Sequence, residues 1–205
     1  MTNQFKLLES KVGDKKARIG VVSQEVNSLS ITQRTSGFID KMVELLNKKG
    51  IKTAVTGHDK FKNDVNEADA KVVIEVRVPA QVDDAAGKTE ASTVLEKEDT
   101  IAIYGSNEFA AKAIINANGG FKESKLGADK ILAVGFDSGA LQQDAIRKGI
   151  FVGSVTQDPV QIGYQAVKLA IAAAKGETVK DVDTGSKWYD AKNIDSDEIK
   201  ALLYE

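Results

Sequence analysis

The sequence predicts an α/β protein built on a doubly wound parallel sheet that is flanked by helices. Short apolar runs typical of buried strands alternate with longer helical segments along most of the chain. Residues 100–118 show the repeating unit most clearly. An apolar run ends at Gly105, and alanine-rich helical sequence follows from Glu108. Because such units succeed one another, their strands are expected to pair in parallel and to be covered by helices on both sides.

The remaining elements follow the same pattern. A short helix is expected within 2–16 and another in the tail, where Asp195 or Ser196 caps it. Ser28 or Ser30 is expected to cap the helix that begins near residue 31. Strands are expected at 18–23, 51–56, 71–78, 100–105, 130–136 and 151–156, and the main helices at 31–48, 85–96, 108–118, 141–148 and 159–175.

Two details of this layout are more specific. Pro159 suits the first turn of its helix, and Gly176 suits the position just past the end. Residues 57–69 are polar and charged, although strand-like segments flank them on both sides. We therefore expect one of these two flanking strands to be an insertion that forms a hairpin at the edge of the sheet.

Composition excludes several classes of protein. The 205 residues are 42% hydrophobic and 28% charged, which is ordinary for a globular protein with a buried core. A net charge of −2 gives no electrostatic footprint for nucleic acid. No run is long and apolar enough to cross a membrane. The first twenty residues contain no apolar core, so no signal peptide is expected in this chain.

The sequence contains no pattern of catalytic or metal-binding residues. It has no cysteine and one histidine, His58, which excludes thiol chemistry and gives no clustered metal ligands. Neither a phosphate-binding loop nor a dinucleotide-binding glycine turn is present. Ser138 lies in GFDSG, which lacks the spacing of a nucleophile elbow. We expect a protein that is not an enzyme and that uses no metal or cofactor.

Four polar side chains follow predicted strands. They are Arg34, Asn107, Asp137 and Gln157. Singly, each is explained as well by helix capping or a turn, Asn107 above all. In a doubly wound sheet, however, the carboxyl ends of the strands meet at one edge, where ligands bind. One guanidinium, one carboxylate and two carboxamides suit a hydroxyl-rich ligand such as a sugar or polyol.

Several motifs resemble one known family. The segments are ITQRTSGF, AIYGSNEFAAKAIINAN, ILAVGFDSGALQQDAIRKGIFVGSVTQDPVQIGYQAV and VDTGSKWYDAKNID. In this order they resemble the sugar-type (type 1) periplasmic binding proteins of bacterial ABC transporters. The resemblance covers nearly all of 18–205 and is weakest through 53–71. It implies the same α/β fold, a periplasmic or extracellular cell-surface location, and a membrane permease as partner.

The resemblance also implies roles for individual residues. In that family an arginine, a strand-end asparagine, the aspartate of GFD and a glutamine before x-Pro hydrogen-bond the sugar hydroxyls. The matching positions are Arg34, Asn107, Asp137 and Gln157. Asn107 is aligned in preference to Ser106 because this choice needs no gap in the helix that follows.

The chain departs from the family pattern in two ways. Members have two similar domains with the ligand between them, whereas this chain resembles the second domain alone, with extra length around 57–69. We expect 1–180 to form a ligand-binding lobe and 181–205 to be a crossover tail, which in the family packs on the first domain. The apolar tail is expected to pair with a first-domain chain, to self-associate or to fold back on its own sheet.

Two related functions are alternatives to the transport role. The chain could be the effector-sensing domain of a sugar receptor or of a lac-repressor-type regulator, which share the fold. The sequence contains no helix-turn-helix segment or basic patch, which argues against the regulator. The segment IRKGIFVGSVTQDP is also more similar to transporter receptors.

Overall fold

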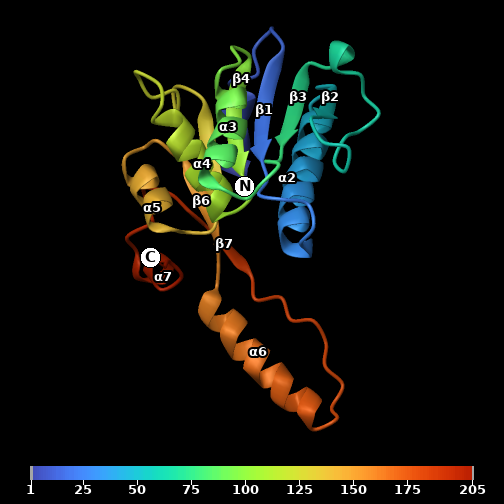
Figure 1. Ribbon diagram of the computed structural model, residues 1–205, viewed down its shortest axis with the longest axis vertical. Helices are drawn as coiled ribbons and strands as arrows, with labels where there is room; N and C mark the ends of the chain where they lie inside the picture. The colour runs from blue at the N-terminus through green and yellow to red at the C-terminus, as the bar shows by residue number, and fades with distance from the viewer. Residues whose placement is uncertain (1, 205) are drawn as a thin grey trace.

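The computed structural model describes residues 2–204, and the side chains from Phe5 onward. It contains one seven-stranded sheet in the order β2-β3-β1-β4-β5-β6-β7 (Figure 1). The first six strands pair in parallel, and β7 pairs antiparallel with β6. The predicted doubly wound α/β class is confirmed. The strands are β1 (Ala17–Val22), β2 (Thr53–Thr56), β3 (Val72–Arg77), β4 (Thr100–Gly105), β5 (Leu132–Phe136), β6 (Gly153–Gln157) and β7 (Ser186–Tyr189).

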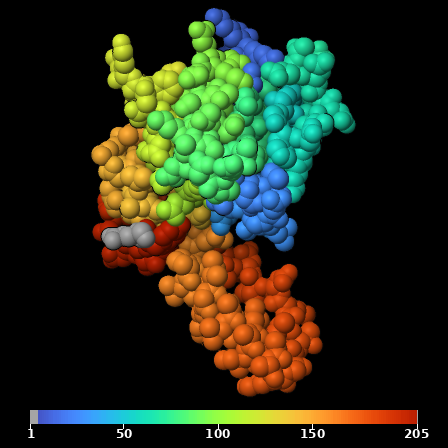
Figure 2. Space-filling model, in the orientation of Figure 1, coloured from blue at the N-terminus to red at the C-terminus, as the bar shows by residue number. Residues whose placement is uncertain are grey.

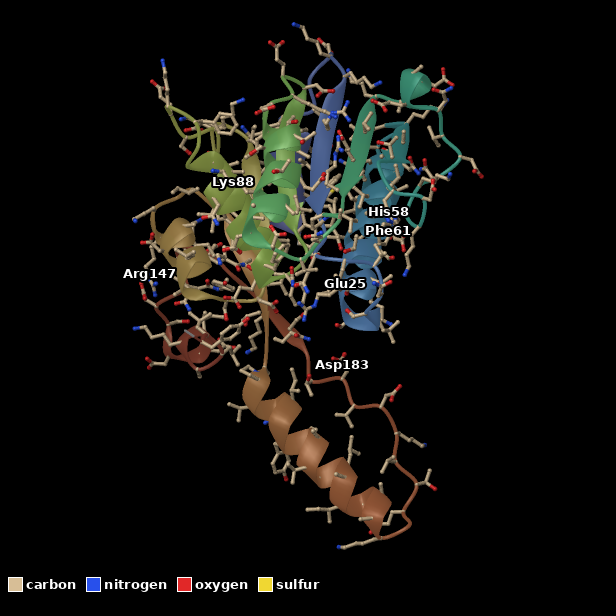
Figure 3. The ribbon with its side chains drawn as sticks, viewed as in Figure 1. Glu25, His58, Phe61, Lys88, Arg147 and Asp183 are labelled. Atoms are coloured by element: carbon tan, nitrogen blue, oxygen red, sulfur yellow. The ribbon has the colours of Figure 1, made fainter. Side chains whose placement is uncertain are left out.

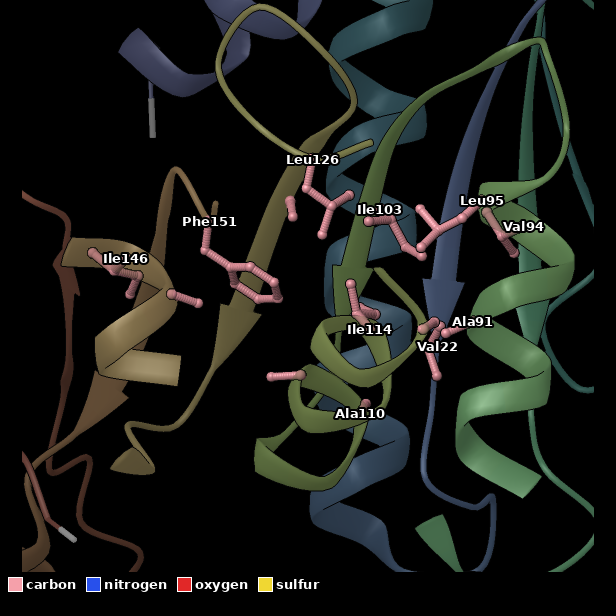
Figure 4. Packing of buried hydrophobic residues seen from close by; sticks show 14 of the residues in the cluster. Val22, Ala91, Val94, Leu95, Ile103, Ala110, Ile114, Leu126, Ile146 and Phe151 are labelled. Atoms are coloured by element: carbon pink, nitrogen blue, oxygen red, sulfur yellow. The ribbon is translucent and has the colours of Figure 1, made fainter. Parts of the chain in front are cut away.

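Helices cover both faces of the sheet. On one face α1 and α2 pack against alternate residues of β1 and β3, among them Ile19 and Ile74. On the other face α3, α4 and α5 enclose a second core that includes Ile103, Ile114 and Phe151 (Figure 4). The helices are α1 (Thr2–Glu9), α2 (Leu29–Lys48), α3 (Asp84–Leu95), α4 (Glu108–Asn118), α5 (Ala140–Arg147), α6 (Pro159–Ala174) and α7 (Asp197–Lys200), with a 3₁₀ turn η1 (Glu67–Asp69).

The ends of the helices follow from local sequence. The Ser28 hydroxyl accepts a hydrogen bond from the Ile31 amide and caps α2, and Ser196 caps α7 in the same way. Pro159 occupies the first turn of α6, and Gly176 follows its end in a left-handed conformation with φ of 80°. These assignments agree with the sequence.

The expected edge hairpin is wrong. Strand β2 pairs with β3 in parallel, so both belong to the main sheet. Two consecutive strands can pair in parallel only if the connection between them runs back to the end of the sheet at which the first strand began. Residues 57–71 make that return, and the Asn63 side chain bonds the Val55 amide and the Thr53 carbonyl along the outer edge of β2. The polar segment therefore covers a sheet edge that would otherwise be open.

A buried ionic cluster lies on the face of the sheet that α3 covers. The Glu75 carboxylate on β3 is 5% exposed and accepts hydrogen bonds from Arg18, Arg77 and Lys97 at 2.6–2.7 Å. Arg18, on β1, also bonds the Asp99 carboxylate at 3.0 Å. Three cations therefore surround one buried carboxylate, which compensates for removing it from water.

The C-terminal part of the chain divides into two unlike pieces. Residues 186–204 join the body, where Tyr189, Ile194 and Leu202 are buried. In contrast, α6 and the segment after it project from the body as an arm, defined here as residues 158–185 (Figure 2). No helix in the described residues has the length and apolar character needed to span a membrane.

Candidate functional site

Three of the four polar residues predicted at the strand ends are bonded to one another. Arg34, in the second turn of α2, donates from Nη1 to Oδ2 of Asp137 at 2.9 Å and from Nη2 to Oε1 of Gln157 at 2.8 Å. Asp137 directly follows β5, and Gln157 is the last residue of β6. The planar guanidinium bridges two strand ends because its donors diverge in a fixed fork.

Asn107 lies at the next strand end but is not bonded to the other three. Its Oδ1 accepts from the Ala110 amide, so it caps α4, and its Nδ2 donates to Gln24. The adjacent Glu108 amide donates to Oδ2 of Asp137 at 3.1 Å. Asn107 itself therefore makes no bond to the cluster, but the backbone amide of the next residue does. We refer to Arg34, Asn107, Asp137 and Gln157 together as the polar rim.

The rim is held on a rigid apolar base. The guanidinium carbon of Arg34 lies 4.1 Å from the ring centre of Phe136, which is cation–π distance. Behind it, Phe38 and Tyr104 stack with ring centres 4.2 Å apart. The Arg34 and Asp137 side chains are each 17% exposed, so they are reachable from solvent and partly shielded from it. Charge-assisted bonds in such surroundings are stronger than on an open surface.

The backbone at Asp137 is unusual. Its φ is 73°, and it is the one residue other than glycine with positive φ in the described part of the chain. Its carbonyl oxygen accepts from Gln142 Nε2, Ser154 Oγ and Tyr189 Oη, at 3.1, 3.1 and 2.7 Å. Left-handed backbone is costly for most residues and persists where surrounding contacts fix it. Three donors from α5, β6 and β7 therefore set the direction of the Asp137 side chain.

Replacing Tyr189 with phenylalanine is expected to lower the free energy of unfolding by about 1 kcal/mol, since it removes one buried hydrogen bond and retains the ring. Urea unfolding followed by circular dichroism measures the change. Tyr204→Phe is the matched control, because its hydroxyl lies near the surface, where it bonds Glu108 at 3.3 Å. Equal losses in the two variants would contradict a specific role for Tyr189.

Sequence reasoning missed several residues around the rim. Gln24 contacts Asn107 from the loop after β1, and Tyr189 supports Asp137 from a strand that the sequence did not predict. The hydroxyls of Ser106 and Ser138 are buried beside the strand ends and have no hydrogen-bond partner within the described residues. The available signal for the two serines was their position in the sequence, because each lies directly beside a predicted site residue, Ser106 next to Asn107 and Ser138 next to Asp137.

The site contains polar groups suited to binding, without a metal cluster. Within residues 2–204 no three histidine or acidic side chains are close enough to hold a metal ion. His58 lies beside Phe61 on the segment between β2 and β3 (Figure 3). The guanidinium fork of this site donates hydrogen bonds, its carboxylate accepts them, and its carboxamide groups do both.

An α/β lobe with a polar rim at the carboxyl edge of its sheet is a typical ligand-binding lobe. The family model described as "Periplasmic binding protein domain" matches residues 2–178. The chain belongs to the periplasmic binding protein domain family. The family includes periplasmic sugar-binding proteins of ABC transporters. A comparison with curated proteins gave no match.

Solved structures show the same fold. A Brachyspira murdochii protein titled "ABC transporter, LacI family transcriptional regulator" is 36% identical over all of this chain, with a TM-score of 0.80. Solute-binding proteins from Agrobacterium vitis, with D-fucose, and from Agrobacterium radiobacter, with D-arabinose, are 24% and 23% identical over 97% of it, with TM-scores of 0.69 and 0.70. The chain spans 62% of the first protein's length and 59% of each of the others.

Proposed function

We propose that this chain forms one wall of a binding cleft for a sugar or polyol and that it performs no catalysis. The observation that carries the proposal is the bonded cluster of Arg34, Asp137 and Gln157 at the carboxyl edge of the sheet. Family membership supports a transport role in the periplasm, with a membrane permease as partner. The sugars bound to the two Agrobacterium proteins support the ligand class.

The chemistry of the rim suits adjacent hydroxyl groups. A carboxylate such as Asp137 accepts from two neighbouring hydroxyls, and Arg34 donates to hydroxyl oxygens from its fork. Asn107 and Gln157 each offer one acceptor and two donors. In the structure Arg34 bonds both Asp137 and Gln157, and Asn107 bonds Gln24, so none of the charge is left unpaired. Sugar hydroxyls would then replace some of these existing hydrogen bonds within the rim.

A single wall is expected to bind weakly. Hydrogen bonds to a ligand that stays in contact with water contribute little net free energy, because they replace bonds to water. In the family a second lobe closes over the ligand, and closure of this kind excludes water. We propose that 181–205 lies against such a lobe when one is present. For the isolated chain we expect a dissociation constant of about 1 mM or weaker, which corresponds to about 4 kcal/mol or less.

Nuclear magnetic resonance titration tests both parts of the proposal. D-Fucose, D-arabinose and a panel of hexoses, pentoses and polyols are added to the ¹⁵N-labelled chain. The side-chain signals of Arg34, Asn107 and Gln157 are expected to shift in fast exchange for at least one of them. If no compound moves these signals, the proposed ligand class is wrong. Tight binding by a monomer would instead contradict the need for a second wall.

A further inference from the structure

Helix α6 carries an apolar surface that nothing in its own chain covers. None of its residues is buried. Val160, Tyr164 and Val167 are each at least 60% exposed, and with Ile171 they form one stripe at helical spacing. Its polar residues, Gln161, Gln165 and Lys168, lie together on another side. The side chains of α6 project into open space (Figure 3). A helix with so little polar surface is typical of a buried position.

The body of the molecule has an apolar groove of matching character. It has a volume of about 500 Å³ and lies on the α2 face of the sheet, over β4, β5, β6 and β7. Phe38 and Met42 of α2 form one side, Tyr104 and Val134 form the floor, and Trp188 of β7 forms the other side. On this face α1 and α2 cover the strands near β1, whereas the strands near β6 lack a helix.

The connections of the arm hold α6 away from this groove. Strand β6 ends at Gln157, α6 begins at Pro159, and the single residue between them, Asp158, caps the helix. At the other end Ser186 pairs with Gln157 across the two strands. Both ends of the arm are therefore fixed at one point, and the helix continues outward from β6 instead of turning back over the sheet (Figure 1).

We propose that the groove is filled by α6 of a second copy, and that two copies exchange arms in a two-fold symmetric, domain-swapped dimer. An exchanged arm with a short extended hinge is the usual geometry of such dimers. The 16 residues of α6 span about 24 Å, and the 20 residues of neighbouring α2 span about 30 Å, so α6 fits alongside. Helix α6 contains no acidic residue, and its one lysine lies on the polar side, where it stays in water.

Engineered cysteines distinguish a swapped dimer from other arrangements. The chain has no cysteine, so Val167→Cys on α6 and Met42→Cys in the groove introduce one defined pair. In a swapped dimer, oxidation of the double variant links two chains covalently. If α6 folds back onto its own groove, the same disulfide forms within one chain and the product stays monomeric. That result, or no disulfide at all, would overturn the proposal.

A second experiment measures the mass of the unmodified chain. Light scattering is expected to give twice the chain mass of 22.0 kDa. Val167→Glu is expected to convert the dimer to a monomer with unchanged strand and helix signals in circular dichroism, because residue 167 has no buried contact within its own chain. Gln165→Glu, on the polar side of the same helix, adds the same charge and is expected to leave the dimer intact. A strict monomer for the unmodified chain, or loss of the dimer in both variants, contradicts the exchange.

Discussion

Replacing Glu75 with glutamine is expected to lower the free energy of unfolding by about 3–5 kcal/mol, because it removes one partner from a buried ion cluster. The carboxylate accepts from Arg18, Arg77 and Lys97 and is nearly inaccessible to water. Glutamine keeps the shape but removes the negative charge and turns an amide donor toward cations. Urea unfolding measures the loss.

The control for this prediction is Glu67→Gln. The Glu67 carboxylate also contacts Arg18, at 3.1 Å, but it is 43% exposed. An exposed pair contributes about 0–1 kcal/mol, so this variant is expected to be close to wild type. Similar losses in the two variants would show that burial of Glu75 is not the deciding factor.

The effect of Glu75 is also expected to depend on pH. Burial alone raises its pKa, but the hydrogen bond from Lys97 and the charges of Arg77 and Arg18 outweigh burial and hold the pKa below its usual range. A carboxyl group of this kind stabilises the fold fully above its unfolded-state pKa of about 4.3, and the contribution is lost as the pH falls through the folded-state pKa. The difference in stability between wild type and Glu75→Gln should therefore shrink below about pH 4.3. A difference that stays constant into acid would contradict this account.

Asp137→Asn is expected to weaken sugar binding about 10- to 100-fold. The substitution removes the charge that pairs with Arg34 and accepts from the Glu108 amide. Hydrogen bonds to a charged group contribute about 1.5–3 kcal/mol, and each 1.4 kcal/mol is a factor of ten in affinity. Asparagine tolerates positive φ as well as aspartate does, so the backbone at position 137 is preserved. The titration that tests the proposed function measures the change.

Asp144→Asn provides the matched control for the binding experiment. Asp144 lies on α5, is more than half exposed and pairs only with Lys148 among the described residues. Its replacement removes the same charge without touching the rim, and binding is expected to be unchanged. If both variants bind like wild type, the Asp137 carboxylate does not contact the ligand.

The fold was largely predictable because its signals are local. The apolar runs of β4 and the capped helices α2 and α6 begin and end within a residue or two of their predicted bounds. Strand β7 was missed because four residues that mix lysine with aromatics carry no strand period. The parallel pairing of β2 with β3 depends on how residues 57–71 return across the sheet, and local sequence does not contain that information.

The site was predictable to a lesser degree. The rule that strand ends share one edge places Arg34, Asp137 and Gln157 together, and the structure does bring these three into contact. The rule does not predict which of these groups bond directly. In the structure Asn107 is separate from the other three and caps a helix. The left-handed backbone of Asp137 and the support from Tyr189 arise from packing between distant segments. Whether the four side chains bind sugar stays a prediction.

The contacts of the rim join residues that are far apart in the chain. Arg34 is 103 positions from Asp137 and 123 positions from Gln157. Closing such large loops is slow compared with forming a helix. During translation the ribosome releases Arg34 long before either partner, so the guanidinium lacks both partners until Asp137 has emerged after β5, and it lacks Gln157 until β6 is complete. The polar rim is thus assembled late, after much of the sheet has been synthesised.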